Sequence, residues 1–139
     1  MANTIHVDIV SAEGQIFSGD ASMVFVPGSQ GELGIAPRHA PLLTTLKAGE
    51  VRVQSEGREE QSFYVGGGAL EIQPHLVTVL ADTAARAKDL DEAAALAAKQ
   101  RAEDAMSTHT DKVQIAEAQA ELLRAVAQLR AIERLRKKR

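Results

Sequence analysis

The pattern of hydrophobic and polar positions differs between the first and second parts of the chain. At the N-terminus, the apolar residues Ile5, Val7 and Ile9 recur with a period of two, which is typical of a strand with one buried face. Further short apolar runs next to Gly or Pro turn signals predict strands at Met23–Val26, Val51–Val53, Phe63–Val65, Ala69–Gln73 and Val77–Leu80. The third of these is expected to stop at Gly66–Gly68, where a bulge or tight connection would lead into the next strand. Strands at this spacing indicate an antiparallel sandwich or barrel.

The second part of the chain has the spacing of helices. Asp89 and Glu92 form a capping-box pattern, so a first helix is predicted to start there and to end near Met106. After a polar loop, Asp111 and Gln114 repeat the pattern and predict the start of a second helix. Apolar residues recur along this second helix at three- and four-residue intervals, at Ile115, Ala118, Leu122, Ala125, Leu129 and Ile132. The first helix is mostly Ala, which favours helix but buries little area, so we expect a thin interface that can exchange one surface for another.

Composition changes at the same place as the hydrophobic pattern. All ten Gly and all four Pro lie at or before Pro74. Residues 1–82 carry 4 basic and 10 acidic side chains, whereas residues 83–139 carry 12 basic and 9 acidic ones. We therefore expect an all-β sandwich or barrel domain over residues 1–86 and an antiparallel α-helical hairpin domain over residues 87–139.

Composition also excludes several classes of chemistry. The chain has no Cys, and its four His are too scattered to form a metal-binding motif. It has no G-x-x-x-x-G-K-[ST] phosphate loop, and 3% aromatic residues are too few for base stacking. No apolar run approaches the roughly 20 residues that span a bilayer. We therefore expect a regulatory interaction protein that binds neither metal nor nucleic acid and is cytosolic or attached to a membrane only through a partner.

Three loops have both a structural and a functional interpretation. Gly28–Gly34 is rich in glycine but lacks Lys and a following helix, which favours a plain turn and leaves a contact loop as the alternative. His39 lies between two prolines, where a local hydrogen bond or a contact role is expected. Glu56, Glu59 and Glu60 are interpreted as the solvated tip of a hairpin.

Eight short segments resemble one known family. In chain order they are Val10–Glu13, Phe17–Gly19, Gly31–Ile35, His39–Leu43, Leu70–Pro74, Val77–Asp82, Leu90–Ala93 and Ala127–Arg130. They resemble the epsilon subunit of bacterial F-type ATP synthases, and the likeness spans essentially the whole chain with the same division into sandwich and hairpin.

The resemblance implies a rotor component without an active site of its own. In this family the sandwich clasps the gamma subunit and rests on the membrane ring of c subunits, and proton flow turns all three together. The rotation drives ATP formation in the catalytic alpha/beta head. The hairpin either folds against the sandwich or extends along gamma into the head, where it blocks ATP hydrolysis. Such a protein would be peripheral, at the cytoplasmic face of the bacterial inner membrane.

The resemblance also implies two sets of contact residues. The ring contact falls on Gln30, Gly31, Glu32 and His39. The inhibitory basic end of the second helix comprises Arg130, Arg134, Arg136, Lys137, Lys138 and Arg139. A solvated tail that complements the helix dipole is the structural alternative for these cations.

Some members of the family bind ATP near the start of the first helix. Asp91 and Arg101 match residues of that site, but Ala94 stands where those members carry an arginine. Because a guanidinium is a bidentate phosphate partner, its loss predicts weak or absent ATP binding and no resident cofactor. A stand-alone ATP-sensing regulatory module is the alternative function.

Overall fold

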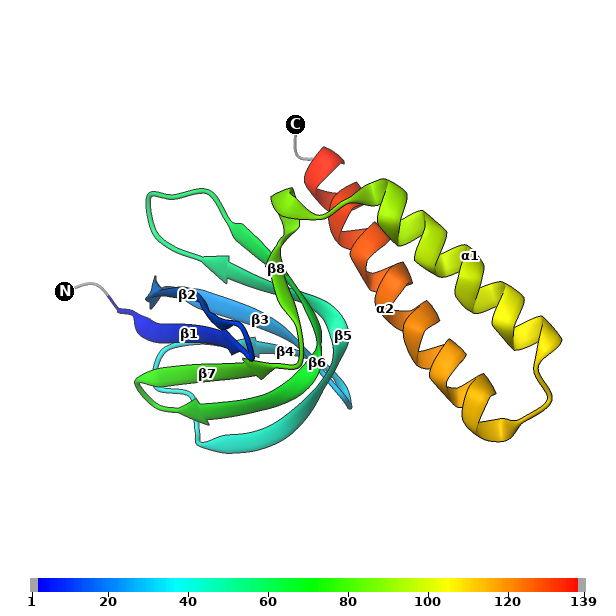
Figure 1. Cartoon of the computed structure of the whole chain (residues 1–139). Helices are drawn as coiled ribbons and strands as arrows, with labels where there is room; N and C mark the ends of the chain where they lie inside the picture. Colours follow the sequence, from blue (N-terminus) through cyan, green and yellow to red (C-terminus); the bar gives the residue numbers. More distant parts are fainter. Residues whose placement is uncertain (1–2, 138–139) are drawn as a thin grey trace. The chain divides into compact units, whose positions relative to one another are not determined.

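The computed structural model describes residues 3–137 and divides the chain between Arg86 and Ala87 into two compact units (Figure 1). The first unit contains β1 (Ile5–Ser11), β2 (Gly14–Ala21), β3 (Met23–Gly28), β4 (Gly31–Ile35), β5 (Leu42–Gln54), β6 (Gln61–Gln73), β7 (Leu76–Ala81) and β8 (Ala84–Arg86). The second contains a 3₁₀ turn, η1 (Ala87–Asp89), and the helices α1 (Glu92–Thr108) and α2 (Lys112–Lys137). The expected fold class, an all-β sandwich followed by a helical hairpin, is confirmed.

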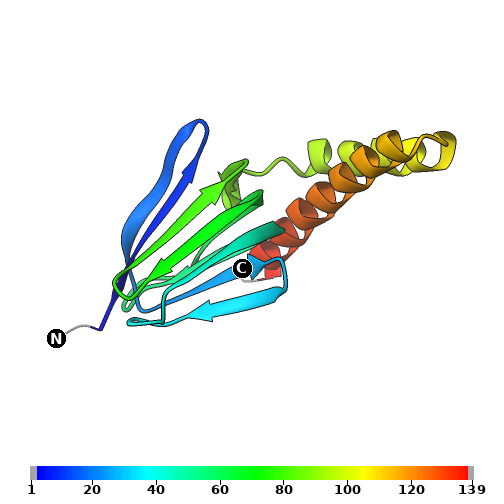
Figure 2. The same cartoon turned by 90° about the horizontal axis from the view of Figure 1, so that it is seen from below.

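The strands of the first unit belong to one sheet with the order β2-β1-β7-β6-β5-β3-β4, and β8 also pairs with β6. All neighbouring strands are antiparallel except β1 and β7, which run parallel. The long strands β5 and β6 bend and take part in both layers (Figure 2). Residues 68–73 of β6 pair with β7, whereas residues 63–65 pair with β8, so one strand serves two parts of the sandwich.

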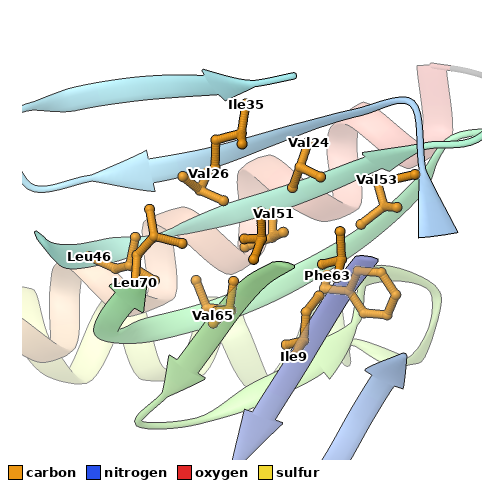
Figure 3. Packing of buried hydrophobic residues seen from close by; sticks show 14 of the residues in the cluster. Ile9, Val24, Val26, Ile35, Leu46, Val51, Val53, Phe63, Val65 and Leu70 are labelled. Atoms are coloured by element: carbon orange, nitrogen blue, oxygen red, sulfur yellow. The ribbon is translucent and has the colours of Figure 1, made fainter. Parts of the chain in front are cut away.

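The core lies between the two layers and consists of aliphatic residues with a single phenylalanine (Figure 3). Ile5, Val7 and Ile9 of β1 are fully buried, as their period of two predicts. Facing them are side chains of the other strands, among them Val24, Val26, Ile35, Val51, Val53, Phe63, Val65 and Leu70. Burying each such side chain contributes about 1.5–3 kcal/mol, and all of these residues come from the first unit.

The glycine run 66–68 does not end a strand, contrary to the expectation from sequence. β6 continues through it, and the run marks the place where β6 changes partner from β8 to β7. Gly68 has φ +140°, and a Cβ there would lie 2.1 Å from the backbone oxygen of Leu80. Glycine therefore allows the bend because no side chain fits.

Three strands were missed by the hydrophobic pattern, namely β2, β4 and β8. Gly31–Ile35 pairs with β3 as a hairpin, so only Ser29 and Gln30 form the turn within the predicted Gly28–Gly34 loop. The strand was missed because three of the seven residues in that loop are glycines, which are depleted in strands.

The first helix begins two residues later than predicted. Asp89 was expected to cap α1, but it lies in η1, and Asp91 is the N-cap, its carboxylate accepting a hydrogen bond from the Ala94 N–H at 3.1 Å. The second cap is confirmed, because the Asp111 carboxylate accepts from the Val113 N–H at 2.8 Å. The buried residues of the two helices are all alanines: Ala95, Ala102, Ala118, Ala125, Ala127 and Ala131.

Candidate functional site

The β3–β4 hairpin, which holds three of the four predicted ring-contact residues, is fixed to β5. The Ser29 N–H donates to the Thr45 carbonyl at 3.0 Å, and the Thr45 hydroxyl donates to Ser29 Oγ at 2.8 Å. Gln30 is exposed at the tip, and Gly31 has φ +137°, a conformation that favours glycine. The turn therefore presents a small, rigid and nearly uncharged projection.

Glu32 carries the charge of this hairpin and is paired with Arg52. Arg52 Nη2 lies 2.9 Å from Glu32 Oε1, its Nη1 lies 3.5 Å from Glu60 Oε1, and its guanidinium stands 4.4 Å above the Phe25 ring. The Arg52 and Glu60 side chains are each only 16% exposed. The expectation that Glu60 belongs to a solvated tip is therefore wrong, whereas Glu56 and Glu59 are exposed as predicted.

His39 lies in a loop tied to the β6–β7 turn. Its Nδ1 lies 2.7 Å from the Ala40 carbonyl oxygen, which confirms the expected local hydrogen bond. The neighbouring Arg38 N–H donates to the Pro74 carbonyl at 2.8 Å, and Arg38 has φ +66°, in the left-handed region. Within residues 3–137, no hydrogen bond or ion pair joins His39 to residues 30–32. The structure thus places the predicted ring-contact residues in two separate places, the β3–β4 hairpin and the loop before β5.

Two exposed leucines on the outer face of the sheet, Leu43 and Leu80, were missed by sequence reasoning. Leu43 is 74% exposed and Leu80 is 52% exposed. Leu80 pairs with Val10 on one side and with Ala69 on the other, and Ala69 pairs with Thr45, two residues from Leu43 on the same face of β5. The signal was present in the sequence, because Leu80 alternates out of phase with the buried Val77 and Val79.

The same face carries a polar cluster around His6. Its Nδ1 lies 2.9 Å from Asp20 Oδ1, and its Nε2 lies 3.1 Å from Asp8 Oδ1 and 3.0 Å from Ser18 Oγ. The hydrogen bond to Asp20, together with Asp8 and against partial burial, raises the pKa of His6 above its ordinary value of 6.5. The Ser18 hydroxyl donates to Asp8 at 2.7 Å, so its proton is directed at a carboxylate and not at the imidazole, unlike the arrangement of an activated serine.

The two candidate nucleotide residues have structural partners within the helical unit. Asp91 caps α1 through Ala94, and Arg101 Nη2 lies 3.7 Å from Glu121 Oε1 on α2. Arg101 follows Asp91 by ten positions, which is about 15 Å along a helix. A small cavity of about 160 Å³ includes neither of them and is lined by Ala87, Lys88, Leu90, Ile132, Leu135 and Arg136.

The basic end of α2 is exposed, at Arg130, Arg134, Arg136 and Lys137. Arg136 Nη2 lies 2.5 Å from Glu92 Oε2 at the start of α1, and Lys137 Nζ lies 3.5 Å from Glu133 Oε1 in its own helix. Lys138 and Arg139 lie outside the described residues. Across residues 3–137, no helix is long and apolar enough to cross a membrane, and no group of His, Asp and Glu side chains is arranged to hold a metal ion.

Two family models together match nearly the whole chain. Residues 4–87 match the beta-sandwich domain of the ATP synthase delta/epsilon chain, and residues 88–133 match its long alpha-helix domain. The solved structures with this fold include a chain of the Euglena gracilis mitochondrial ATP synthase, with a TM-score of 0.84 and 16% identity over 95% of this chain and 83% of that chain. A chain of the Tetrahymena thermophila mitochondrial ATP synthase has a TM-score of 0.66 and 11% identity over 92% of this chain and 96% of that one.

Other relatives are much more similar to the chain in sequence than the proteins of these two structures. The ATP synthase epsilon chain of Nitrosococcus oceani is 64% identical over 99% of both chains. The ATP synthase epsilon chain 1 of Methylococcus capsulatus is 62% identical over 100% of this chain and 99% of its own length. Both domain matches and these identities lead to one conclusion: the chain belongs to the family of ATP synthase epsilon chains.

Proposed function

We propose that the chain couples rotation of the membrane c-ring to ATP synthesis as part of the central stalk and inhibits ATP hydrolysis through its C-terminal helices. The observation that carries this proposal is the construction from two units, a sandwich with its own core and a hairpin whose buried residues are all alanines. A self-contained sandwich can stay attached while a weakly packed hairpin changes partner. The chain would have no catalytic site and would lie at the cytoplasmic face of the inner membrane, held there by the complex.

The sandwich offers two surfaces for the expected partners. We assign the outer sheet face that carries Leu43 and Leu80 to the gamma subunit, because covering exposed leucine side chains would stabilise the complex. We assign four exposed or half-exposed residues of the β3–β4 hairpin and the loop before β5 to the polar loops of the c-ring: Gln30, Gly31, Glu32 and His39.

The ring contact is tested by reversing the charge of Glu32. Glu32→Lys places a cation next to Arg52 and changes the projecting hairpin, so we expect partly reduced proton coupling in the assembled enzyme. An exposed charge is worth about 0.2–1 kcal/mol, which predicts a partial defect. Glu56→Lys and Glu59→Lys make the same charge change at exposed positions away from Arg52 and serve as controls. Equal defects in all three variants would reduce the effect to net charge.

The inhibitory role falls on the basic end of α2. A helix of 26 residues is about 39 Å long, enough to reach from a central stalk into a catalytic head. Exposed cations at its end can pair with an acidic segment of the catalytic subunits, which the resemblance to the family implies.

The test of inhibition removes those cations in the assembled enzyme. Replacing Arg134, Arg136, Lys137, Lys138 and Arg139 with Ala should raise ATP hydrolysis and spare ATP synthesis. The difference from the unmodified enzyme should shrink as salt rises, because exposed charges are screened over about 8–10 Å at 0.1–0.15 M salt. Lys112→Ala with Arg124→Ala removes exposed cations elsewhere on α2 and should leave hydrolysis unchanged. Unaltered hydrolysis at low salt in the variant of the basic end would refute the electrostatic role.

The alternative, an ATP-sensing module, has one supporting observation. The cavity of about 160 Å³ between η1 and the end of α2 has two cations, Lys88 and Arg136, at its lining. Asp91 and Arg101 are engaged as a helix cap and in an ion pair, and position 94 lacks a guanidinium, so we propose weak or no ATP binding. Equilibrium binding of ATP to the isolated chain tests this, and Ala94→Arg should strengthen it. Tight binding by the unmodified chain would favour the alternative.

A further inference from the structure

Ion pairs connect the opposite helices of the hairpin, among them Glu92–Arg136 and Arg101–Glu121. Glu92, the first residue of α1, pairs with Arg136 in the last turn of α2 at 2.5 Å. Nearer the loop, Arg101 Nη2 lies 3.7 Å from Glu121 Oε1. These two pairs oppose separation of the helices, whereas the pairs of Lys99 with Glu103 and of Lys137 with Glu133 lie within one helix and do not.

The ion pairs matter for the stability of the hairpin because the apolar contact between α1 and α2 is small. The buried residues of α1 and α2 are all alanines, and Leu96 and Leu123 are 51% and 63% exposed. The larger side chains of the apolar stripe on α2 are only half-buried, at Ile115, Leu122, Leu129 and Ile132. A buried methyl group contributes much less than a buried leucine side chain. A pair of charges between these helices is therefore a larger share of the total attraction than it would be in a hairpin packed with leucines.

The position of the Glu92–Arg136 pair strengthens it. A carboxylate at a helix N-terminus and a guanidinium at a helix C-terminus each interact favourably with the dipole of their own helix. The antiparallel hairpin brings these two ends together, so each charge is stabilised by its own helix and by its partner. Arg136 also belongs to the exposed basic end of α2.

We propose that Glu92 is an internal competitor for the basic end of α2. Through Arg136 it holds the hairpin closed, and it must be displaced before Arg136 can pair with an acidic segment of another protein. The identity of that acidic segment rests on the proposed inhibitory function, whereas the closing contact stands on the geometry of the hairpin alone.

The closing contact is tested on the full chain by amide hydrogen exchange in α1. Glu92→Gln and Arg136→Gln should each raise the exchange rates of the α1 amides about two- to fivefold at low salt. Glu103→Gln is the matched control, because it makes the same charge change at a similar exposure, 47% against 45%, within a single helix. Combining Glu92→Gln with Arg136→Gln should raise the exchange rates by less than the product of the two single effects, because either change alone already breaks the pair. Exchange that rises equally in Glu103→Gln, or fully multiplicative effects in the double variant, would overturn the proposal.

Competition is tested with a hexaglutamate peptide as the acidic probe. Glu92→Gln should bind the peptide about two- to fivefold more tightly than the unmodified chain, and adding Arg136→Gln should abolish the gain. An equal gain in Glu103→Gln would show an effect of net charge and would overturn the competition. These results are independent of the proposed function, which fails if removal of the basic end leaves hydrolysis by the assembled enzyme unchanged.

Discussion

At the scale of single residues, Arg38 has an unusual backbone: within residues 3–137 it is the one residue other than glycine in the left-handed region. Its φ of +66° is retained because its N–H donates to Pro74 and its guanidinium lies 3.4 Å from Asn3 Oδ1. Left-handed backbone costs a residue with a Cβ about 1–2 kcal/mol. The loop that carries His39 therefore stores some strain in a fixed conformation.

The strain at Arg38 can be measured by comparing two substitutions at this position. Arg38→Gly and Arg38→Ala both remove the guanidinium, but only Gly relieves the backbone. We expect the Gly variant to be more stable than the Ala variant by about 1 kcal/mol, measured by urea unfolding of the full chain. Equal stabilities would mean that the backbone at this position relaxes in solution.

His6 predicts a pH dependence of stability. The pKa of His6 is raised in the folded chain above 6.5, its value in the unfolded chain. The stabilisation that His6 contributes to the folded state is therefore fully present below pH 6.5 and is lost as pH rises through the folded pKa. The groups that face it are Asp8 and Ser18 along with Asp20, all on β1 and β2.

The check is a comparison with His6→Gln between about pH 5.5 and about pH 8.5. The unmodified chain should exceed the variant by about 0.2–1 kcal/mol in the free energy of unfolding at the acidic limit, and the difference should shrink at the alkaline limit. Asp20→Asn should remove most of the dependence because Asp20 supplies the main hydrogen bond. A difference that grows with pH would contradict this assignment.

At the scale of elements, the bend of β6 depends on glycine. Gly68→Ala adds a Cβ that meets the Leu80 carbonyl oxygen at 2.1 Å in a backbone with positive φ. We expect a loss of about 2–5 kcal/mol in the free energy of unfolding, from strain and from steric conflict together. Gly57→Ala is the control, since Gly57 also has positive φ, +76°, but has nothing within 4 Å of a new Cβ. Similar losses in both variants would show that backbone strain alone explains the requirement.

At the scale of the whole molecule, the sandwich should fold without the hairpin. Its core cluster runs from Ile5 to Ala81 and contains no residue of α1 or α2. A chain without residues 88–139 should therefore unfold cooperatively and, in the assembled enzyme, keep proton coupling while hydrolysis changes. Circular dichroism and urea unfolding of the shortened chain check the first point. A truncated chain without a cooperative transition would show that the hairpin is needed for folding.

Much of this architecture could be predicted from the sequence because it is encoded locally. The period of two in Ile5, Val7 and Ile9 places their side chains on one face of a strand, and the structure buries all three. The absence of Gly and Pro after Pro74, with regular apolar spacing, is sufficient for two helices. The cap at Asp111 follows from the same local chemistry.

Tertiary structure decided what depends on residues far apart in the chain. The local pattern predicts that a strand ends at Gly66–Gly68. In the folded protein β6 continues through these glycines and bends there, because it pairs with β8 before them and with β7 after them. From the sequence, Glu60 was expected to be solvated, but strand pairing brings Arg52 next to it and the two side chains form an ion pair. The pairing of Glu92 with Arg136 joins residues that are 44 positions apart, and only the antiparallel packing of the helices brings these charges together. Backbone conformation follows from neighbouring residues, whereas ion pairs and strand partners depend on chain segments that meet only after folding.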